Sequence, residues 1–142
     1  MTKRSKHLKH HKGQISLPGG KLEAQDKDFQ QCAYREAYEE IGFEQNKAIY
    51  LGKLNKYITG SGFLIQPIVV LAENGQNFIM NRQEVTSILH FPINYLLSNK
   101  VIRKVFLDDY QNKYFLNIYW KKNKIWGATA KILVDLINLL RK

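Results

Sequence analysis

Three glutamates stand close together, just before a glycine, in the stretch "REAYEEIGF" at residues 35–43. A helix turns by about 100° per residue, so Glu36, Glu39 and Glu40 fall within an arc of roughly 100° and share one face. Carboxylates in a last turn oppose the negative end of the helix dipole, and Glu36 with Glu40 is a like-charge pair at i, i+4 spacing. A solvated acidic face is the ordinary interpretation of such a cluster. Two local conflicts at one place are, however, typical of a functional site.

The chemistry that this cluster predicts is the binding of a hard divalent cation. Mg²⁺ prefers oxygen ligands, with an octahedral shell completed by water and phosphate. Arg35 directly precedes the cluster and can hold one carboxylate in place through a bidentate pair. The residues therefore predict a metal site on one helix face, with the solvated face as the alternative.

The helix that carries the cluster has both of its ends marked in the sequence. Asp28 is the expected N-cap, Gln31 completes a capping-box pattern, and Gly42 supplies the stop. Before it, "ISLPGG" ends a short extended run with a turn. After it, strands are expected over residues 48–58 and 62–72, joined by the glycine-rich turn "TGSG".

The second half of the chain predicts two more helices and a strand. A short helix entered through Pro92 is expected over residues 91–99, and the alternation of "YFLNIYW" predicts a strand over residues 114–120. The tail over residues 125–142 predicts an amphipathic closing helix, because apolar side chains recur at helical spacing at Ile132, Leu133, Leu136, Ile137 and Leu140. Strands mixed with two or three helices predict a layered α/β fold.

Length and composition favour one domain. A chain of 142 residues with 44% apolar and 12% aromatic residues can build one core, so residues 1–142 are expected to form a single domain. No run approaches the roughly 18 consecutive apolar residues of a membrane-spanning helix, and the basic start lacks the apolar segment of a secretory signal. The single Cys32 cannot form an internal disulfide. We therefore expect a cytoplasmic protein without a membrane partner.

The net charge of +10 predicts a surface that attracts anions. Nucleic acid, an acidic membrane surface and a small phosphorylated substrate are the candidates, and background composition is an equal explanation for the scattered lysines. The densest basic segment is "KRSKHLKHHK" at residues 3–12, which as a lone feature predicts a solvated tail.

The segment "GGKLEAQDKDFQQCAYREAYEEIGF" resembles the signature of the Nudix hydrolases. That signature ends in a motif matched here by Arg35, Glu36, Glu39, Glu40, Gly42 and Phe43. The distance from Gly20 to Arg35 is longer by about one residue than in the commonest form, and the acidic position before the helix falls on Asp26. This longer form is similar to that of the coenzyme A pyrophosphatase branch of the family.

Further segments along the whole chain resemble the same branch. Its upstream signature is matched at Thr2, Arg4, Ser5, Lys9, Gly13, Leu17, Pro18, Gly19 and Gly20, where Lys9 replaces the usual Arg and Leu17 the usual Phe. "TGSGFLIQPIV" is similar to the branch's central strand entry, and "QEVTSILHFPINYLL" to its segment before a Pro-led helix. "IWGATAKIL" is similar to its closing helix.

The resemblance implies a Nudix-type layered fold, with a mixed β-sheet between helices. The family has an apolar strand before the upstream signature, and this chain starts at Met1-Thr2, so that first strand is expected to be missing and the domain to be N-terminally short. The implied reaction is hydrolysis of the diphosphate of coenzyme A or a derivative, giving adenosine 3′,5′-bisphosphate and 4′-phosphopantetheine. Mg²⁺ or Mn²⁺ is the implied cofactor, neutralising the diphosphate and activating a water.

The resemblance also implies roles for individual residues. Arg35, Glu36 and Glu40 are the expected catalytic residues, and the metal ligands are Glu36, Glu39 and Glu40. Substrate contacts are expected at His11, Gly13, Gln14, Gly20, Ser61, Gly62 and Phe63, with Glu84 as a distal acid. The alternatives are a turn-forming role for Gly13, core packing for Phe63 and a surface loop position for Glu84.

Two other functions compete with this prediction. Another Nudix hydrolase, acting on a dinucleotide or a sugar nucleotide, would carry the same glutamates. A non-catalytic basic module that binds RNA or another protein would show salt-sensitive binding and no hydrolysis. The intact glutamate cluster argues against the latter, so a small molecule and not a nucleic acid is the expected partner. The oligomeric state stays open, with a homodimer as one alternative.

Overall fold

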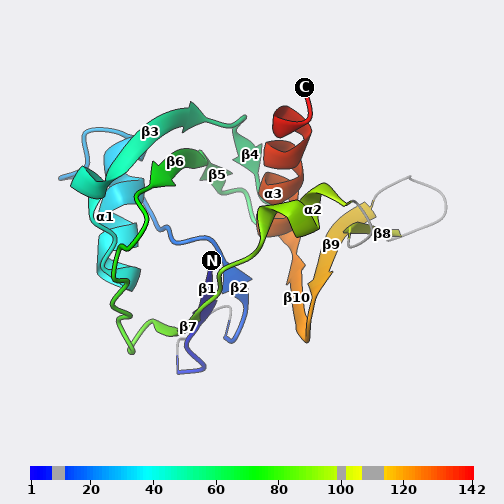
Figure 1. The fold of residues 1–142 in the computed structure, drawn as a ribbon, viewed down its shortest axis with the longest axis horizontal. Helices are drawn as coiled ribbons and strands as arrows, with labels where there is room; N and C mark the ends of the chain where they lie inside the picture. Colours follow the sequence, from blue (N-terminus) through cyan, green and yellow to red (C-terminus); the bar gives the residue numbers. More distant parts are fainter. Residues whose placement is uncertain (8–11, 99–101, 107–113) are drawn as a thin grey trace. The chain divides into compact units, whose positions relative to one another are not determined.

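The computed structural model describes residues 1–7, 12–98, 102–106 and 114–142. The chain divides into two compact units, Met1–Leu89 and His90–Lys142, and each contains both strands and helices (Figure 1). This mixture confirms the predicted α/β class. In the part of the chain that is described, the paired strands are antiparallel. None of the described helices combines the length and the apolar character needed to cross a membrane.

A short strand at the beginning of the chain is the centre of a three-stranded sheet in the first unit. Thr2 pairs with Ser16 on one side and with Ile88 on the other. Thr2 and Ser5 are fully buried. Residues 2–5 of the basic start are therefore part of the folded first unit and do not form a solvated tail. The order of the sheet is β2-β1-β7, with β1 at Thr2–Arg4, β2 at Ile15–Ser16 and β7 at Val85–Ile88.

Helix α1, Phe29–Ile41, begins and ends where the sequence predicts. Asp28 Oδ1 accepts from the Gln31 N–H at 2.8 Å, and Gly42 ends the helix with φ at 66°, a left-handed conformation that glycine adopts without strain. The predicted capping box is only half formed, because Gln31 Oε1 accepts from the N–H of Lys27 and not from that of Asp28.

The two long strands predicted over residues 48–58 and 62–72 are wrong, since each is broken into two. Pro67 has no N–H for a strand ladder. Near it, the Gln66 side-chain amide donates to the Leu54 carbonyl at 2.8 Å, at the place where both predicted strands are interrupted. A short 3-10 turn, η1 at Gln45–Lys47, leads into β3 at Ala48–Lys53, which pairs with β6 at Ile68–Ala72; β4 at Tyr57–Ile58 pairs with β5 at Leu64–Ile65.

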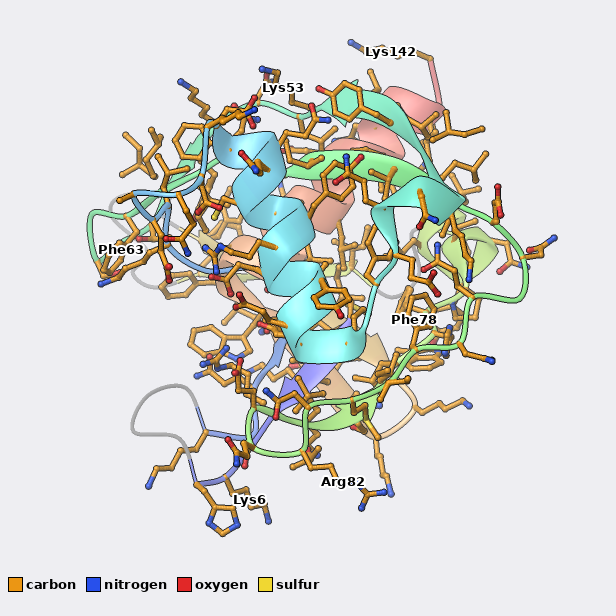
Figure 2. All side chains as sticks on the ribbon, turned by 90° about the vertical axis from the view of Figure 1, so that its left-hand side faces the viewer. Lys6, Lys53, Phe63, Phe78, Arg82 and Lys142 are labelled. Carbon is orange, nitrogen blue, oxygen red and sulfur yellow. The ribbon has the colours of Figure 1, made fainter. Side chains whose placement is uncertain are left out.

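The core of the first unit lies on the apolar side of α1. Tyr34, Ile41 and Phe43 are buried together, with the rings of Tyr34 and Phe43 stacked at 6.1 Å. Residues of β3 and β6 pack against this cluster, as does Phe78. Figure 2 looks onto α1, with Phe63 to one side of it and Phe78 to the other. The packing side of α1 is thus fixed by these aromatic and aliphatic contacts, and its acidic face is left for other partners.

The second unit is a three-stranded sheet packed with a long helix. The predicted strand over residues 114–120 is confirmed, and the short helix is observed over a narrower range than residues 91–99. The sheet order is β10-β9-β8, and the elements are α2 at Ile93–Leu97, β8 at Ile102–Phe106, β9 at Tyr114–Trp120, β10 at Asn123–Trp126 and α3 at Gly127–Leu140.

The closing helix starts later than predicted, because residues 123–126 form a strand. Ile125 pairs with Ile118 across the hairpin, and both side chains are fully buried. At the N-terminal end of the predicted helix, the burial of Ile125 in the sheet therefore outweighs the helical spacing of the apolar residues. Ile132, Leu133 and Ile137 are buried as predicted, whereas Leu140 is exposed in the last turn and does not pack as predicted.

Candidate active site

The three glutamates on the acidic face of α1 differ strongly in their access to water. Glu40 is 2% exposed, the Glu36 side chain is 14% exposed, and the Glu39 side chain is 49% exposed. Only Glu39 fits the alternative of a solvated face. Withdrawing the carboxylates of Glu36 and Glu40 from water is unfavourable unless hydrogen-bond partners compensate for the lost hydration. The partners of each carboxylate therefore have to be identified.

Arg35 braces this face of the helix. Its Nε and Nη2 donate to the two carboxylate oxygens of Asp26, at 3.0 and 2.9 Å. Its Nη1 donates to Glu36 Oε1 at 2.9 Å and to Glu39 Oε2 at 3.2 Å. The prediction that Arg35 forms its bidentate pair with a carboxylate of the cluster is therefore wrong: the bidentate partner is Asp26, and Glu36 and Glu39 each accept a single hydrogen bond from the same guanidinium. These hydrogen bonds lower the pKa of Asp26 to about 2.

Glu40 is held by the beginning of the chain and by Pro18, Gly19 and Gly20, here called the glycine turn. Thr2 Oγ1 donates to its Oε2 at 3.3 Å, and the Gly19 N–H donates to its Oε1 at 3.5 Å. Burial raises the pKa of Glu40, while the Gly19 N–H, the charge of Arg4 and the Thr2 hydroxyl oppose that rise. β1 and residues 18–20 thus enclose this carboxylate.

The main chain at Gly20 approaches the Glu36 carboxylate so closely that a side chain has no room. A Cβ atom added to Gly20 would lie 2.2 Å from Glu36 Oε1. Burial raises the pKa of Glu36, Arg35 opposes this, and the charges of Glu39 and Glu84 add to it. The predicted site residues Gly20 and Glu36 are therefore brought together.

Glu84 lies half-buried in the turn before β7, and its charge adds to the raised pKa of Glu36, so the alternative of a surface loop position for Glu84 stays open. Its Oε1 accepts from Asn81 Nδ2 at 3.2 Å, and the Asn81 N–H donates to the carbonyl of Glu40 at 3.0 Å. The segment before β7 is therefore hydrogen-bonded to the C-terminal end of α1. The local sequence around Asn81 does not predict these hydrogen bonds, since they join segments that are distant in the chain.

The tip of the β4–β5 hairpin lies beside the same glycine turn. Lys21 Nζ is 5.2 Å from the centre of the Phe63 ring, and Phe63 is 54% exposed, so the alternative of core packing for Phe63 is wrong. Ser61 and Gly62 are exposed at the same tip, where Ser61 Oγ lies 3.0 Å from Thr59 Oγ1.

Of the remaining predicted contacts, Gly13 and Gln14 lie between β1 and β2. Gly13 has φ at 68°, which agrees with a turn-forming role, and the Gln14 carbonyl accepts from the Arg4 N–H at 2.9 Å. His11 lies outside the described residues. Arg4, which sequence reasoning did not place in the site, has a charge that acts on Glu40 and a buried Nε without a hydrogen-bond partner. Its place in the upstream signature was the signal that could have found it.

Comparison with known proteins decides the family. The NUDIX domain model matches residues 1–105. The chain belongs to the Nudix family. A protein named "Uncharacterized Nudix hydrolase NudL" from Yersinia enterocolitica is 35% identical over 136 residues, which cover 94% of this chain and 69% of that relative. Proteins of the same name from Photorhabdus laumondii and Yersinia pestis are 33% and 35% identical, over 96% of this chain and 73% and 69% of their own lengths.

Membership of the Nudix family identifies the general class of reaction. The family consists of hydrolases of nucleoside diphosphate derivatives, which are small-molecule substrates, and its members generally use divalent metal ions such as Mg²⁺ or Mn²⁺. The mixed helices and strands of this chain agree with the Nudix fold.

The Nudix glutamates fit such an ion by their donor chemistry. Carboxylate oxygens are the ligands of hard divalent cations, and Gly20 keeps the space against Glu36 free of a side chain. Within the described ranges, no group of three or more His, Cys, Asp or Glu side chains is arranged around a common metal position. The carboxylates of Glu36 and Glu39 pair with Arg35, and that of Glu40 accepts from Thr2 and Gly19.

Proposed function

We propose that this Nudix chain hydrolyses the diphosphate bond of coenzyme A or one of its derivatives, giving adenosine 3′,5′-bisphosphate and 4′-phosphopantetheine. The observation that carries the proposal is the pairing of Arg35 with Asp26 through two hydrogen bonds. Asp26 is the acidic residue of the longer Nudix box, the form that resembles the coenzyme A branch. The pairing supports this alignment of the box, because it ties Asp26 to the same arginine that fixes Glu36 and Glu39.

The metal of the proposed reaction is Mg²⁺ or Mn²⁺, and Glu36, Glu39 and Glu40 are the residues that would hold it. When bound, it would neutralise the diphosphate and lower the pKa of the attacking water. Arg35 keeps two of these carboxylates in place in the structure, and the absence of a side chain at Gly20 lets the Glu36 carboxylate take its observed position.

In the proposed hydrolysis, water oxygen forms a bond to one phosphorus and the bridging oxygen leaves with the other phosphate. One proton of the water passes to a general base. Glu36 and Glu40 are both candidates, because burial raises the pKa of each toward the range in which a carboxylate accepts a proton effectively near neutral pH. Glu84 is the proposed distal acid, supported by its action on Glu36.

Further parts of the same proposal concern the whole chain. Residues 1–142 form a single Nudix domain, which is supported by a family match that runs from residue 1 to residue 105 and so crosses the boundary between the two units. Substrate contacts are proposed at Gly13, Gln14, Gly20, Ser61, Gly62 and Phe63, together with His11. A cytoplasmic location and a homodimer remain predictions.

The test is an assay of this chain with coenzyme A and Mg²⁺ or Mn²⁺, in which the two products are separated by chromatography. Glu40→Gln is expected to lower turnover by about 100-fold or more, which is the usual contribution of a catalytic acid or base. The fold is expected to survive, because the glutamine oxygen can accept from the Gly19 N–H while its amide group donates to the Thr2 hydroxyl, and a hydrogen-bonded neutral amide is less costly to bury than a carboxylate.

Glu44→Gln is the matched control, because Glu44 lies just beyond the same helix and pairs only with Lys47 among the ion pairs of the described residues. It is expected to leave turnover unchanged. Unchanged turnover in Glu40→Gln would contradict the catalytic assignment. Preference for a dinucleotide or a sugar nucleotide would identify another Nudix hydrolase, and salt-sensitive RNA binding without hydrolysis would favour the non-catalytic module.

A further inference from the structure

Two contacts between a lysine and a phenylalanine attach the region of the β4–β5 hairpin to the segment before α1 and to the first residue of α1. Lys21 Nζ lies 5.2 Å from the centre of the Phe63 ring, at the tip of the hairpin. Lys56 Nζ lies 5.9 Å from the centre of the Phe29 ring, at the base of the hairpin. Both distances are within the range of cation–π attraction. The two contacts have the same chemistry, but Lys21 directly follows Gly20 whereas Phe29 lies farther along the chain.

Only the first of these contacts adjoins the glutamate cluster. Lys21 follows Gly20, whose main chain touches the Glu36 carboxylate, and the Lys21 carbonyl accepts from Arg35 Nη2 at 3.1 Å. The position of Lys21 is therefore fixed from both sides of the site. The residue whose ammonium group contacts the Phe63 ring is therefore attached through its main chain to the arginine that holds Glu36 and Glu39.

The main chain that carries Phe63 is held in position, although more than half of the residue faces water. The Thr59 N–H donates to the Phe63 carbonyl, and the Phe63 N–H donates to Thr59 Oγ1, both at 2.9 Å. Gly62 provides the tight turn with φ at 83°. An exposed phenylalanine on a hydrogen-bonded turn offers a preorganised flat surface, which lowers the entropy that a ligand must lose on stacking.

We infer that Lys21 and Phe63 form the nucleoside subsite of the proposed active site, where the ring stacks on a purine base and the ammonium group pairs with a phosphate of the same nucleotide. The inference rests on the proposed function, since it names the half of the substrate that lies at the hairpin. A nucleotide offers both partners, a π face and an anionic oxygen. A phosphate is also a stronger partner for Lys21 than a neutral ring, so the ligand displaces the ammonium group from Phe63.

The nucleotide is favoured over the other half of coenzyme A by the chemistry of this pair. Phosphopantetheine carries an anionic group but has no aromatic ring to stack on Phe63. It would use Lys21 and leave the exposed ring without a specific partner. The two halves therefore give different predictions for substitutions at Phe63.

The experiment is calorimetric titration of the whole chain with adenosine 3′,5′-bisphosphate in the presence of EDTA, so that binding is measured apart from catalysis. Phe63→Leu is expected to weaken binding about 5- to 100-fold, the range found when a stacking aromatic is removed. Phe63→Tyr keeps the ring and is expected to retain the affinity. Lys21→Gln is expected to weaken binding and to make it less sensitive to salt.

Phe29→Leu and Lys56→Gln are the matched controls, because they remove the same type of contact at the other end of the hairpin. Both are expected to leave the affinity unchanged, and thermal unfolding checks that every variant is folded. The inference is overturned if the bisphosphate does not bind, if Phe63→Leu binds it as tightly as the natural chain, or if the controls weaken binding equally. It is also overturned if Phe63→Leu weakens the binding of 4′-phosphopantetheine instead.

The outcome for the subsite can be separated from the outcome for the proposed function. If coenzyme A is not hydrolysed but bisphosphate binding depends on Lys21 and Phe63, the subsite stands and the proposed substrate fails. If coenzyme A is hydrolysed and Phe63→Leu leaves bisphosphate binding unchanged, the proposed function stands and the subsite fails.

Discussion

Gly20 and Glu36 share a space at the site that has no room for a methyl group. A Cβ atom on Gly20 would lie between 2.2 and 2.5 Å from the three atoms of the Glu36 carboxyl group. We therefore expect Gly20→Ala to displace this carboxylate and to lower metal-dependent hydrolysis about 100-fold, because a misplacement of about 1 Å has an effect of that size. Steady-state kinetics and thermal unfolding, measured together, test this.

The fold should tolerate Gly20→Ala, because the group that must move is the far end of a flexible side chain. Gly60→Ala is the control at the residue scale, since no atom lies within 4 Å of an added Cβ at that position. It is expected to retain full activity. Full activity in Gly20→Ala would show that the position of Glu36 in the structure is not needed for the reaction.

At the scale of elements, the pair of Asp26 and Arg35 joins the segment before α1 to the helix itself. Hydrogen bonds from Arg35 lower the pKa of Asp26 from 3.8 to about 2 in the folded chain. The ionised form is therefore favoured by folding. This stabilisation is complete above the unfolded pKa near 3.8 and is lost as the pH falls through about 2.

Asp26→Asn is expected to lower the free energy of unfolding at neutral pH, because it removes the charged partner of Arg35. The difference from the natural chain should shrink as the pH falls from about 4 to about 2, as denaturant unfolding at a series of pH values would show. Asp28→Asn is the control, since asparagine is an equally good N-cap and Asp28 has no hydrogen bond with Arg35 among those described. A constant difference over this pH range would rule out the Asp26 charge as the source of the stabilisation.

At the scale of the whole molecule, the net charge of +10 acts on every anionic substrate that approaches. We expect kcat/KM for coenzyme A to fall as the salt concentration rises from about 0.05 to about 0.3 M, because screening shortens the range of the attraction. The value of kcat at saturating substrate should stay constant, since a bound substrate no longer depends on encounter. Stopped-time assays at a fixed metal concentration measure both quantities, and a kcat/KM independent of salt would leave the charge without a role in substrate capture.

Helix α1 shows what could be read from the sequence. Its N-cap Asp28, its C-terminal Gly42 and the common face of its glutamates were all predicted, because each depends on contacts within about one turn of the chain. Strands were predicted less well. β3 and β6 pair with each other, as do β4 and β5, and the breaks between them depend on Gln66 reaching Leu54.

The sequence by itself determined the family signature, the capped helix and the three carboxylates on one side of it. Tertiary structure alone decided that Glu40 is buried against Thr2, that Arg35 pairs with Asp26, and that the Asn81 N–H donates to the Glu40 carbonyl. It also placed Phe63 beside Lys21. The physical reason is that helix caps and helix faces follow from neighbours in the chain. Burial and charge pairing at the site depend instead on β1, the glycine turn, the hairpin and β7, which only folding brings to the helix.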